Sequence, residues 1–315
     1  MKQQIKIVSY NIDGLPEKLD LNTLPWPLRP IAWIYKFIKK TSWITINDNP
    51  NKANDISLIG HKLEELSPDL IAVQEDFNYH KELMSVLSEK YWSGEYAGGF
   101  DLSKLLSRAV TWWRPFPLPR FKCDGLNLLM KGSRFSGFFE HIIPWKKSHG
   151  YFTHANDKLT LKGFRSYHVM GRYIDLGVYV IHMDADFYNP ATCPDVTKDV
   201  KARTSQFKQL AEYIINHDSP LYPSIIIGDT NSSVYYSWDE TNIVQNLIKP
   251  LQDSKTQIVE VVPSGDKKDV DRVFIINYSD AKYKLIPREC SYDESFEGLS
   301  DHLPLVATFD LVENN

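Results

Sequence analysis

Cysteine and long apolar runs are both scarce in this chain, and each scarcity argues against a class of protein. The three cysteines, Cys123, Cys193 and Cys290, are odd in number and widely spaced. This pattern fits neither a disulfide framework nor a zinc site, and it favours a reducing compartment. No apolar run approaches the ~20 residues that a membrane-spanning helix needs. The sequence therefore argues against a disulfide-stapled scaffold and against an integral helical membrane protein.

The chain also has no excess of basic residues and no visible linker. Its formal net charge of -4 argues against indiscriminate nucleic-acid binding, which usually needs a basic surface. Met1 is followed within a few residues by the strand-like run 5–8, so we expect no signal peptide unless one has been removed. Repeats and low-complexity segments are not visible. We expect one domain over residues 1–315, with an inserted aromatic segment at about 21–50.

Residues 224–231, with the sequence SIIIGDTN, are the segment around which the chain is organised. The short β-branched apolar run predicts a buried strand. It ends at Gly228, where the backbone can turn freely, and it delivers Asp229 and Asn231 to a loop. Catalytic groups are often found at strand ends of packed α/β proteins, but Gly-Asp-x-Asn is also an ordinary turn. Its meaning depends on whether other strand ends match it.

Four other predicted strands have polar residues at the corresponding junctions. The strand 5–10 leads to Asn11, the strand 70–73 leads to Glu75, and the strand 176–181 leads to His182. The last strand, 305–311, is preceded by Asp301 and His302. Any one of these groups could be structural, since asparagine forms turns and histidine can cap a strand end. Five such junctions, each carrying groups suited to phosphate or hard-metal chemistry, favour a catalytic site.

The same five segments, in the same order, resemble the endonuclease/exonuclease/phosphatase superfamily, the DNase I-like metal-dependent phosphoesterases. The resemblance extends over residues 5–311. It implies an α/β (α+β) fold, a four-layer sandwich of two packed, mostly antiparallel mixed β-sheets flanked by helices, with the site at one end. The matching segments are Ser9-Tyr10-Asn11, Gln74-Glu75, Ile181-His182, Gly228-Asp229-Thr230-Asn231 and Ser300-Asp301-His302-Leu303-Pro304.

The resemblance and the donor chemistry together imply a metal site. Glu75 is a hard oxygen ligand suited to Mg²⁺, which keeps several waters and binds few protein carboxylates. Asn11 and Asp301 could add a neutral oxygen and a second carboxylate. The expected cofactor is Mg²⁺, with Mn²⁺ or Co²⁺ as possible substitutes, and it would polarise a phosphoryl oxygen.

The resemblance also implies roles for the catalytic side chains. His302 would take a proton from the attacking water, with Asp301 beside it as the carboxylate that raises its basicity. Asp229 would position the water, Asn231 would donate to a phosphate oxygen, and His182 would stabilise the phosphoryl oxygens. The family often has Asn-Thr-His where Val180-Ile181-His182 stands here, so a contact from residue 180 is in doubt.

Within the superfamily, the chain is most similar to neutral sphingomyelinases. Asp124-Gly125-Leu126 and Lys162-Gly163-Phe164 carry this likeness. In part of that group, an aspartate five residues before the lysine pairs with it and switches the site on, which implies a catalytic role for Asp157 and Lys162. An ordinary solvated ion pair, worth well under ~1 kcal/mol, is an equal alternative.

An aromatic segment before residue 50 agrees with a lipid substrate. In a helix over 31–40, lysines form one wedge and aromatic and aliphatic residues cover the rest, a pattern typical of helices at a membrane interface. A helix or lid packed on the domain core is an equal alternative. The adjacent tryptophans in the loop-like stretch 94–122 allow the same two interpretations. The residues that would contact substrate or membrane are Trp33, Lys36, Phe37, Lys40, Trp112 and Trp113.

These patterns predict a Mg²⁺-dependent phosphodiesterase that is cytoplasmic or peripheral at a membrane surface. The expected partner is a phosphoester, a lipid headgroup in the first instance, and the sequence leaves the oligomeric state open. A DNA or RNA endonuclease of the same fold, an inositol-phosphate phosphatase and a non-catalytic binding module are the alternatives. Of the inositol phosphatase motif, only Asp271-Arg272 is kept.

Overall fold

The computed structural model describes thirteen stretches of the chain, and all structural statements below refer to them. They are residues 3–12, 19–20, 30, 44–45, 52–76, 79–94, 125–147, 163–172, 174–184, 196–232, 237–254, 256–265 and 270–314.

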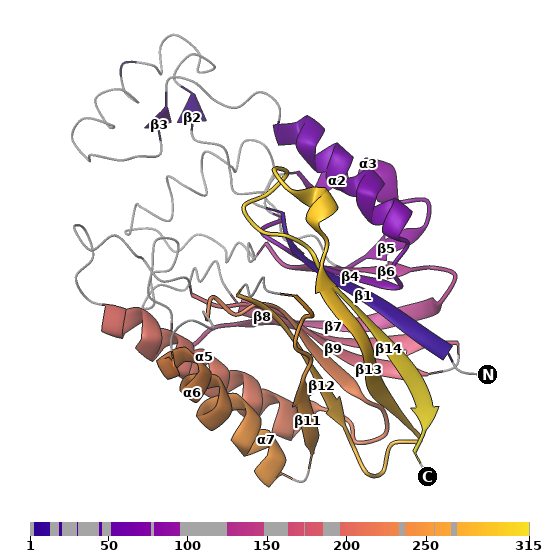
Figure 1. Ribbon diagram of the computed structural model, residues 1–315, viewed down its shortest axis with the longest axis vertical. Helices are drawn as coiled ribbons and strands as arrows, with labels where there is room; N and C mark the ends of the chain where they lie inside the picture. The colour runs from indigo at the N-terminus through magenta and orange to yellow at the C-terminus, as the bar shows by residue number, and fades with distance from the viewer. Residues whose placement is uncertain are drawn as a thin grey trace.

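Two six-stranded sheets form the centre of the molecule (Figure 1). In each sheet one neighbouring pair of strands is parallel, β1 with β4 and β10 with β9, and the other pairs are antiparallel. The first sheet has the order β13 (Tyr283–Tyr292), β14 (Leu305–Glu313), β1 (Gln3–Asn11), β4 (Leu70–Gln74), β6 (Asn127–Lys131) and β5 (Tyr91–Ser93). The second has the order β11 (Gln257–Glu260), β12 (Asp271–Asn277), β10 (Ser224–Asp229), β9 (Asp175–His182), β8 (Gly163–Gly171) and β7 (Phe135–Pro144).

Helices cover the outer face of each sheet. On the first sheet lie α2 (Lys52–Leu66) and α3 (His80–Leu87), and on the second lie α5 (Val196–His217), α6 (Ser237–Ile243) and α7 (Lys249–Asp253) (Figure 1). A π-helical turn, Val244–Ile248, joins α6 to α7, and a 3₁₀ turn, Glu294–Phe296, precedes β14. The two-residue strands β2 (Leu19–Asp20) and β3 (Ile44–Thr45) pair separately. No described helix is long and apolar enough to span a membrane.

Three hydrophobic clusters correspond to the three interfaces of a four-layer sandwich. Side chains alternate along a strand, so successive apolar residues face opposite layers. In β10, Ile225 and Ile227 pack between the two sheets, whereas Ile226 packs against the layer of α5. In β1, Ile7 packs between the sheets and Val8 packs under α2 and α3. Strands that are apolar on both faces are therefore required here, and the predicted four-layer α+β sandwich is confirmed.

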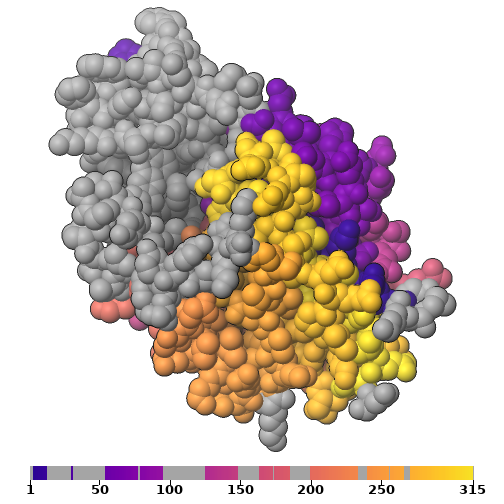
Figure 2. All heavy atoms as spheres, in the orientation of Figure 1, coloured from indigo at the N-terminus to yellow at the C-terminus, as the bar shows by residue number. Residues whose placement is uncertain are grey.

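The C-terminal segment lies between the two helical layers on one face of the molecule (Figure 2). In Figure 2 its residues, shown in yellow, lie between the purple layer of α2 and α3 and the orange layer of α6 and α7. This segment contains the turn Glu294–Phe296 and the start of β14. It thereby carries the residues just before β14 to the edge where β1, β4, β9 and β10 end.

Candidate active site

The ends of four strands from both sheets meet at one edge of the sandwich. β1 and β4 run parallel with Asn11 opposite Gln74, and β9 and β10 run parallel with His182 opposite Asp229. The Asn11 amide Nδ2 donates to Asp229 Oδ2 at 3.3 Å, which joins the end of one sheet to the end of the other. Both side chains are buried. Parallel pairing within each sheet and packing between the sheets therefore bring these distant segments together.

His182 lies between two carboxylates at this edge. Its Nε2 is 3.6 Å from Glu75 Oε1 and 3.5 Å from Asp229 Oδ2. The indole of Trp145 donates to the His182 carbonyl at 2.9 Å and fixes the end of β9. The imidazole is thus held in a buried position between Glu75 and Asp229.

His302 faces the same point from the segment before β14. Its Nδ1 is 2.7 Å from Asp271 Oδ2, and its Nε2 is 3.9 Å from Asp229 Oδ2. Burial by itself lowers the pKa of His302, but the hydrogen bond to Asp271 and the charges of Asp271, Asp229 and Asp301 outweigh it and raise the pKa to about 11. The carboxylate on Nδ1 leaves Nε2 as the ring nitrogen directed at the site.

Backbone geometry at two of these strand ends is unusual. Glu75 has φ 59° and Asn231 has φ 49°, in the left-handed region that few residues other than glycine adopt. Two hydrogen bonds hold Asn231 in this conformation. Its backbone N–H donates to Asp229 Oδ1 at 2.7 Å, and its side-chain Nδ2 donates to the Met183 carbonyl at 2.9 Å. Left-handed non-glycine residues cluster at functional sites, where the surrounding structure holds them.

Gly228 is required by the close approach of β9. It has φ 140°, and a Cβ atom there would lie 2.2 Å from the Ile181 carbonyl oxygen. Any side chain would push β10 away from β9 next to His182. The glycine of the Gly-Asp-x-Asn segment therefore sets the distance between two site-bearing strands.

Solved structures with the same architecture include the following three. D. rerio TDP2 complexed with single strand DNA product has a TM-score of 0.58 at 14% identity, over 98% of this chain and 99% of that chain. A mutant beta toxin from Staphylococcus aureus with bound magnesium ions has a TM-score of 0.58 at 15% identity, over 97% and 99%. Sphingomyelinase C from Streptomyces griseocarneus has a TM-score of 0.55 at 12% identity, over 97% and 99%.

The chain has the DNase I-like fold. Its structural relatives include bacterial sphingomyelinase and TDP2, as the resemblance of the sequence to this superfamily implies. No protein-family model and no curated protein matches the sequence. The likeness therefore lies in the path of the backbone over nearly the whole chain.

Within this DNase I-like fold, the carboxylate that orients His302 is Asp271 rather than Asp301. Asp301 is exposed, and its Oδ1 lies 3.3 Å from Ser300 Oγ. Ser300 Oγ donates to the Asn11 carbonyl at 2.7 Å, which ties the segment before β14 to the end of β1. Asp271 was visible in the sequence as an aspartate at the start of a strand. The cross-strand pairing of Asp229 with Asp271 is what places it in the site.

Two further side-chain contacts lie next to the site residues. Arg203 on α5 is buried and donates to the Asp184 carbonyl at 3.1 Å, two residues after His182, so it supports the end of β9. His80 Nδ1 is 2.6 Å from Asp76 Oδ2, directly after Glu75. These contacts surround the site residues and hold their strand ends.

Several predicted residues lie outside the described part of the chain, and their roles stay predictions. They comprise the Asp/Lys pair and the residues expected to contact substrate or membrane. These are Asp157, Lys162, Trp33, Lys36, Phe37, Lys40, Trp112 and Trp113.

The donor set at this edge fits a hard divalent cation. Glu75, Asn11 and Asp229 present carboxylate and amide oxygens within one buried region, and Asp301 adds a carboxylate nearby. Among the described residues, no group of three or more His, Cys, Asp and Glu is placed to hold a metal ion by itself. Mg²⁺ needs only one or two protein carboxylates because it retains waters, so a sparse oxygen site suits it.

Proposed function

We propose that the protein is a Mg²⁺-dependent phosphodiesterase. The observation that carries the proposal is the meeting of two histidines and three carboxylates from both sheets at one edge. His182 and His302 approach the same Asp229 oxygen at 3.5 Å and 3.9 Å. Glu75 lies next to His182, and Asp271 lies behind His302. Such an arrangement suits a phosphate group, which brings negative charge to the point where the two imidazoles converge.

Each residue has a role in this proposal. Glu75, with Asn11 and Asp301, would hold Mg²⁺. The bound ion would polarise a phosphoryl oxygen, neutralise the leaving oxygen and, by offsetting the carboxylates around His302, lower the pKa of that imidazole. His302 Nε2 would then accept the proton of the attacking water, with Asp271 holding the ring.

The remaining polar groups would bind the phosphate and the water. Asp229 lies within reach of both imidazoles and would orient the water between them. His182 would donate to a non-bridging phosphate oxygen. The Asn231 amide has one hydrogen on the Met183 carbonyl and would use the other for the phosphate.

The substrate that we propose is a phospholipid headgroup. The sphingomyelinase-like residues of the sequence and the aromatic–lysine segment at 31–40 support it, and a sphingomyelinase is among the structural relatives. TDP2, another relative, is complexed with a single strand DNA product, so nucleic acid is the second candidate.

Activity should be measured on four substrates side by side, with Mg²⁺ and with EDTA. They are bis(p-nitrophenyl) phosphate, sphingomyelin vesicles, plasmid DNA and inositol phosphates. We expect Mg²⁺-dependent hydrolysis of the soluble diester and of sphingomyelin. Turnover of DNA alone would overturn the lipid assignment, and no turnover of any diester would overturn the phosphodiesterase.

The lipid assignment has its own test in the aromatic segment. Trp33→Ala with Phe37→Ala should weaken binding to sphingomyelin vesicles, because each aromatic side chain would lose apolar contact with the bilayer interface. Hydrolysis of bis(p-nitrophenyl) phosphate should not change. Trp92→Ala, at a half-exposed tryptophan on β5, is the matched control and should bind vesicles like the wild type.

A further inference from the structure

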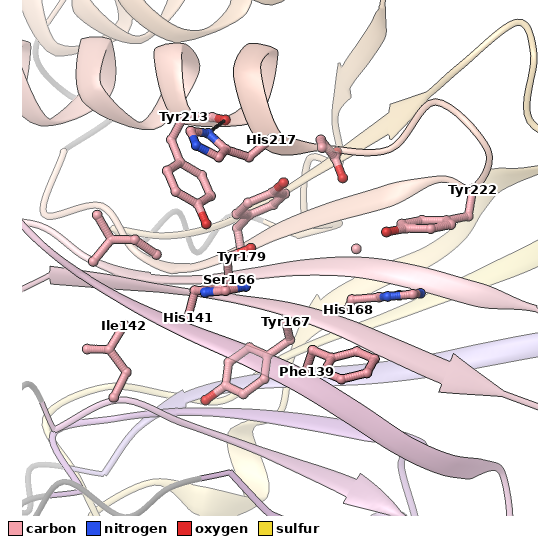
Figure 3. A pocket seen from close by; sticks show the side chains of 13 residues that line it. Phe139, His141, Ile142, Ser166, Tyr167, His168, Tyr179, Tyr213, His217 and Tyr222 are labelled. Carbon is pink, nitrogen blue, oxygen red and sulfur yellow. Dashed lines mark hydrogen bonds between the residues drawn. The ribbon is translucent and has the colours of Figure 1, made fainter.

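An aromatic cavity of about 580 Å³ lies on the outer face of the second sheet. β7, β8 and β9 form its floor, and the C-terminal end of α5 and the loop 218–223 form its wall (Figure 3). Gly177 in its floor lies five positions before His182 on β9, which is about 16 Å along a strand. The cavity is therefore separate from the candidate active site, and its size is that of a small-molecule site.

Cross-strand register builds the floor. Phe139, His168 and Gly177 form one row across β7, β8 and β9, and His141, Ser166 and Tyr179 form the next. Gly177 has no side chain, and the side chains of Ser224 and Asp218 approach the floor there. A Cβ atom at Gly177 would lie 2.1 Å from Ser224 Oγ and 3.0 Å from Asp218 Oδ1. The glycine therefore allows the carboxylate of Asp218 to approach the floor.

Two ring stacks line the cavity, and one of them includes His168 of the floor. Tyr222 stacks on His168 with centroids 4.7 Å apart and an interplanar angle of 10°. Tyr213 stacks on His217 at 4.3 Å and 13°, and both project from α5 towards the sheet (Figure 3). Each stack fixes a tyrosine against a second ring, so the walls are preorganised for a ligand.

Apart from three histidines, the lining residues include one ionisable side chain that is charged near neutral pH, the carboxylate of Asp218. Asp218 Oδ2 accepts from the Tyr278 hydroxyl at 2.6 Å, and Oδ1 accepts from the Ser219 N–H at 3.0 Å. Burial raises the pKa of Asp218, and its hydrogen bonds act in the opposite direction. Among the described lining residues there is no lysine or arginine. A phosphate or carboxylate ligand would have no permanent cation to pair with, whereas a cation would relieve the burial of the Asp218 charge.

We propose that the aromatic cavity is a second ligand site, and that it binds an organic ammonium group. Tyrosine rings attract cations through their faces, and quaternary ammonium groups are bound in this way between aromatic side chains near a carboxylate. The half-buried Asp218 supplies the long-range attraction, and the stacked rings of Tyr222 and Tyr213 supply the enclosing surface.

Calorimetric titration of the full chain with choline and with 3,3-dimethylbutan-1-ol tests the proposal. The alcohol has the shape of choline but carries no charge. We expect choline to bind at least about fivefold more tightly than the alcohol, because one cation–π contact contributes about 1 kcal/mol. Equal affinities, or no binding of choline, would overturn the proposal, and this comparison needs no variant.

Variants then locate the site. Asp218→Asn keeps the shape of the side chain and Tyr222→Leu removes one wall, and each should weaken choline binding at least about fivefold. Leu221→Ala, next to Tyr222 and 69% exposed, is the matched control and should bind normally. His302→Ala should also bind normally. Loss of binding in His302→Ala, with retention in Asp218→Asn and Tyr222→Leu, would place choline in the candidate active site and overturn the aromatic cavity.

Discussion

The two sites on β9 differ in how the fold makes them. At its end, His182 meets residues of both sheets, and a buried group of acids and imidazoles results. Further back on its outer face, Gly177 and Tyr179 meet one helix and one loop, and the result is a surface of aromatic rings around one aspartate. The first arrangement suits an anion together with a metal ion, and the second suits an organic cation.

The comparison also separates two aspartates, the buried Asp271 and the half-buried Asp218. Asp271 and Asp218 both bond to an aromatic side chain at short distance, His302 at 2.7 Å and Tyr278 at 2.6 Å. The hydrogen bond and charge of Asp271 raise the pKa of His302 to about 11, and burial and the charge of Asp218 raise the pKa of Tyr278 far above its usual range. The first aspartate therefore favours the protonated form of a histidine, and the second favours the neutral hydroxyl of a tyrosine.

The largest expected effect is on the rate of diester hydrolysis. His302→Ala should lower kcat on bis(p-nitrophenyl) phosphate by about 10²–10⁴-fold, the range for loss of a general base. Tyr222→Leu in the aromatic cavity should leave kcat unchanged. His61→Ala, at an exposed histidine on α2, is the matched control. Equal rates for His302→Ala and the wild type would show that the group of side chains around Asp229 is not a catalytic site.

The next effect is on stability. Gly228→Ala places a Cβ atom 2.2 Å from the Ile181 carbonyl at a φ of 140°, so we expect a loss of about 3 kcal/mol in the free energy of unfolding. Urea unfolding measures it. Gly265→Ala is the control, since no atom lies within 4 Å of the added Cβ, although its φ of 100° retains the backbone strain. A loss no larger than that of Gly265→Ala would mean that β10 and β9 can separate without cost.

Much of the fold and part of the candidate site could be predicted from the sequence, because both depend on local signals. Apolar runs predict the buried strands. The spacing of apolar residues over 199–216 predicts a helix, and the structure has α5 at Val196–His217. Polar groups after those runs marked Asn11, Glu75, His182 and Asp229, which the structure brings together.

Features that depend on strand neighbours could not be predicted in this way. Asp271 orients His302 only because β12 pairs with β10, a register that no local pattern specifies. The aromatic cavity draws on β7, β8, β9 and α5, so Phe139 and Tyr222 come together from positions far apart in the chain. The alternation of side chains along β8 indicates that Ser166 and His168 share a face. It does not indicate which helix covers that face, because this depends on tertiary packing.

A smaller loss of activity is expected from Asp271→Asn. The amide can still bond to His302 but lacks the charge that raises the pKa of the imidazole and holds its tautomer. We expect kcat on the soluble diester to fall at least about tenfold with little change in KM. Asp218→Asn, the equivalent change in the aromatic cavity, should leave both constants unchanged. A similar fall in both variants would indicate a general loss of stability instead of orientation of His302.

The smallest effect is a pH dependence of stability in the metal-free protein. The folded pKa of His302, about 11, lies above the usual value of 6.5, so protonation of the ring favours the folded state. This contribution is complete below about pH 6.5 and is lost as pH rises towards 11. His302→Gln should therefore destabilise the protein more at pH 6 than at pH 9.5, as urea unfolding in EDTA would measure. A larger destabilisation at pH 9.5 would show that His302 is held neutral in the folded protein. The carboxylates of the candidate active site would then not set its charge.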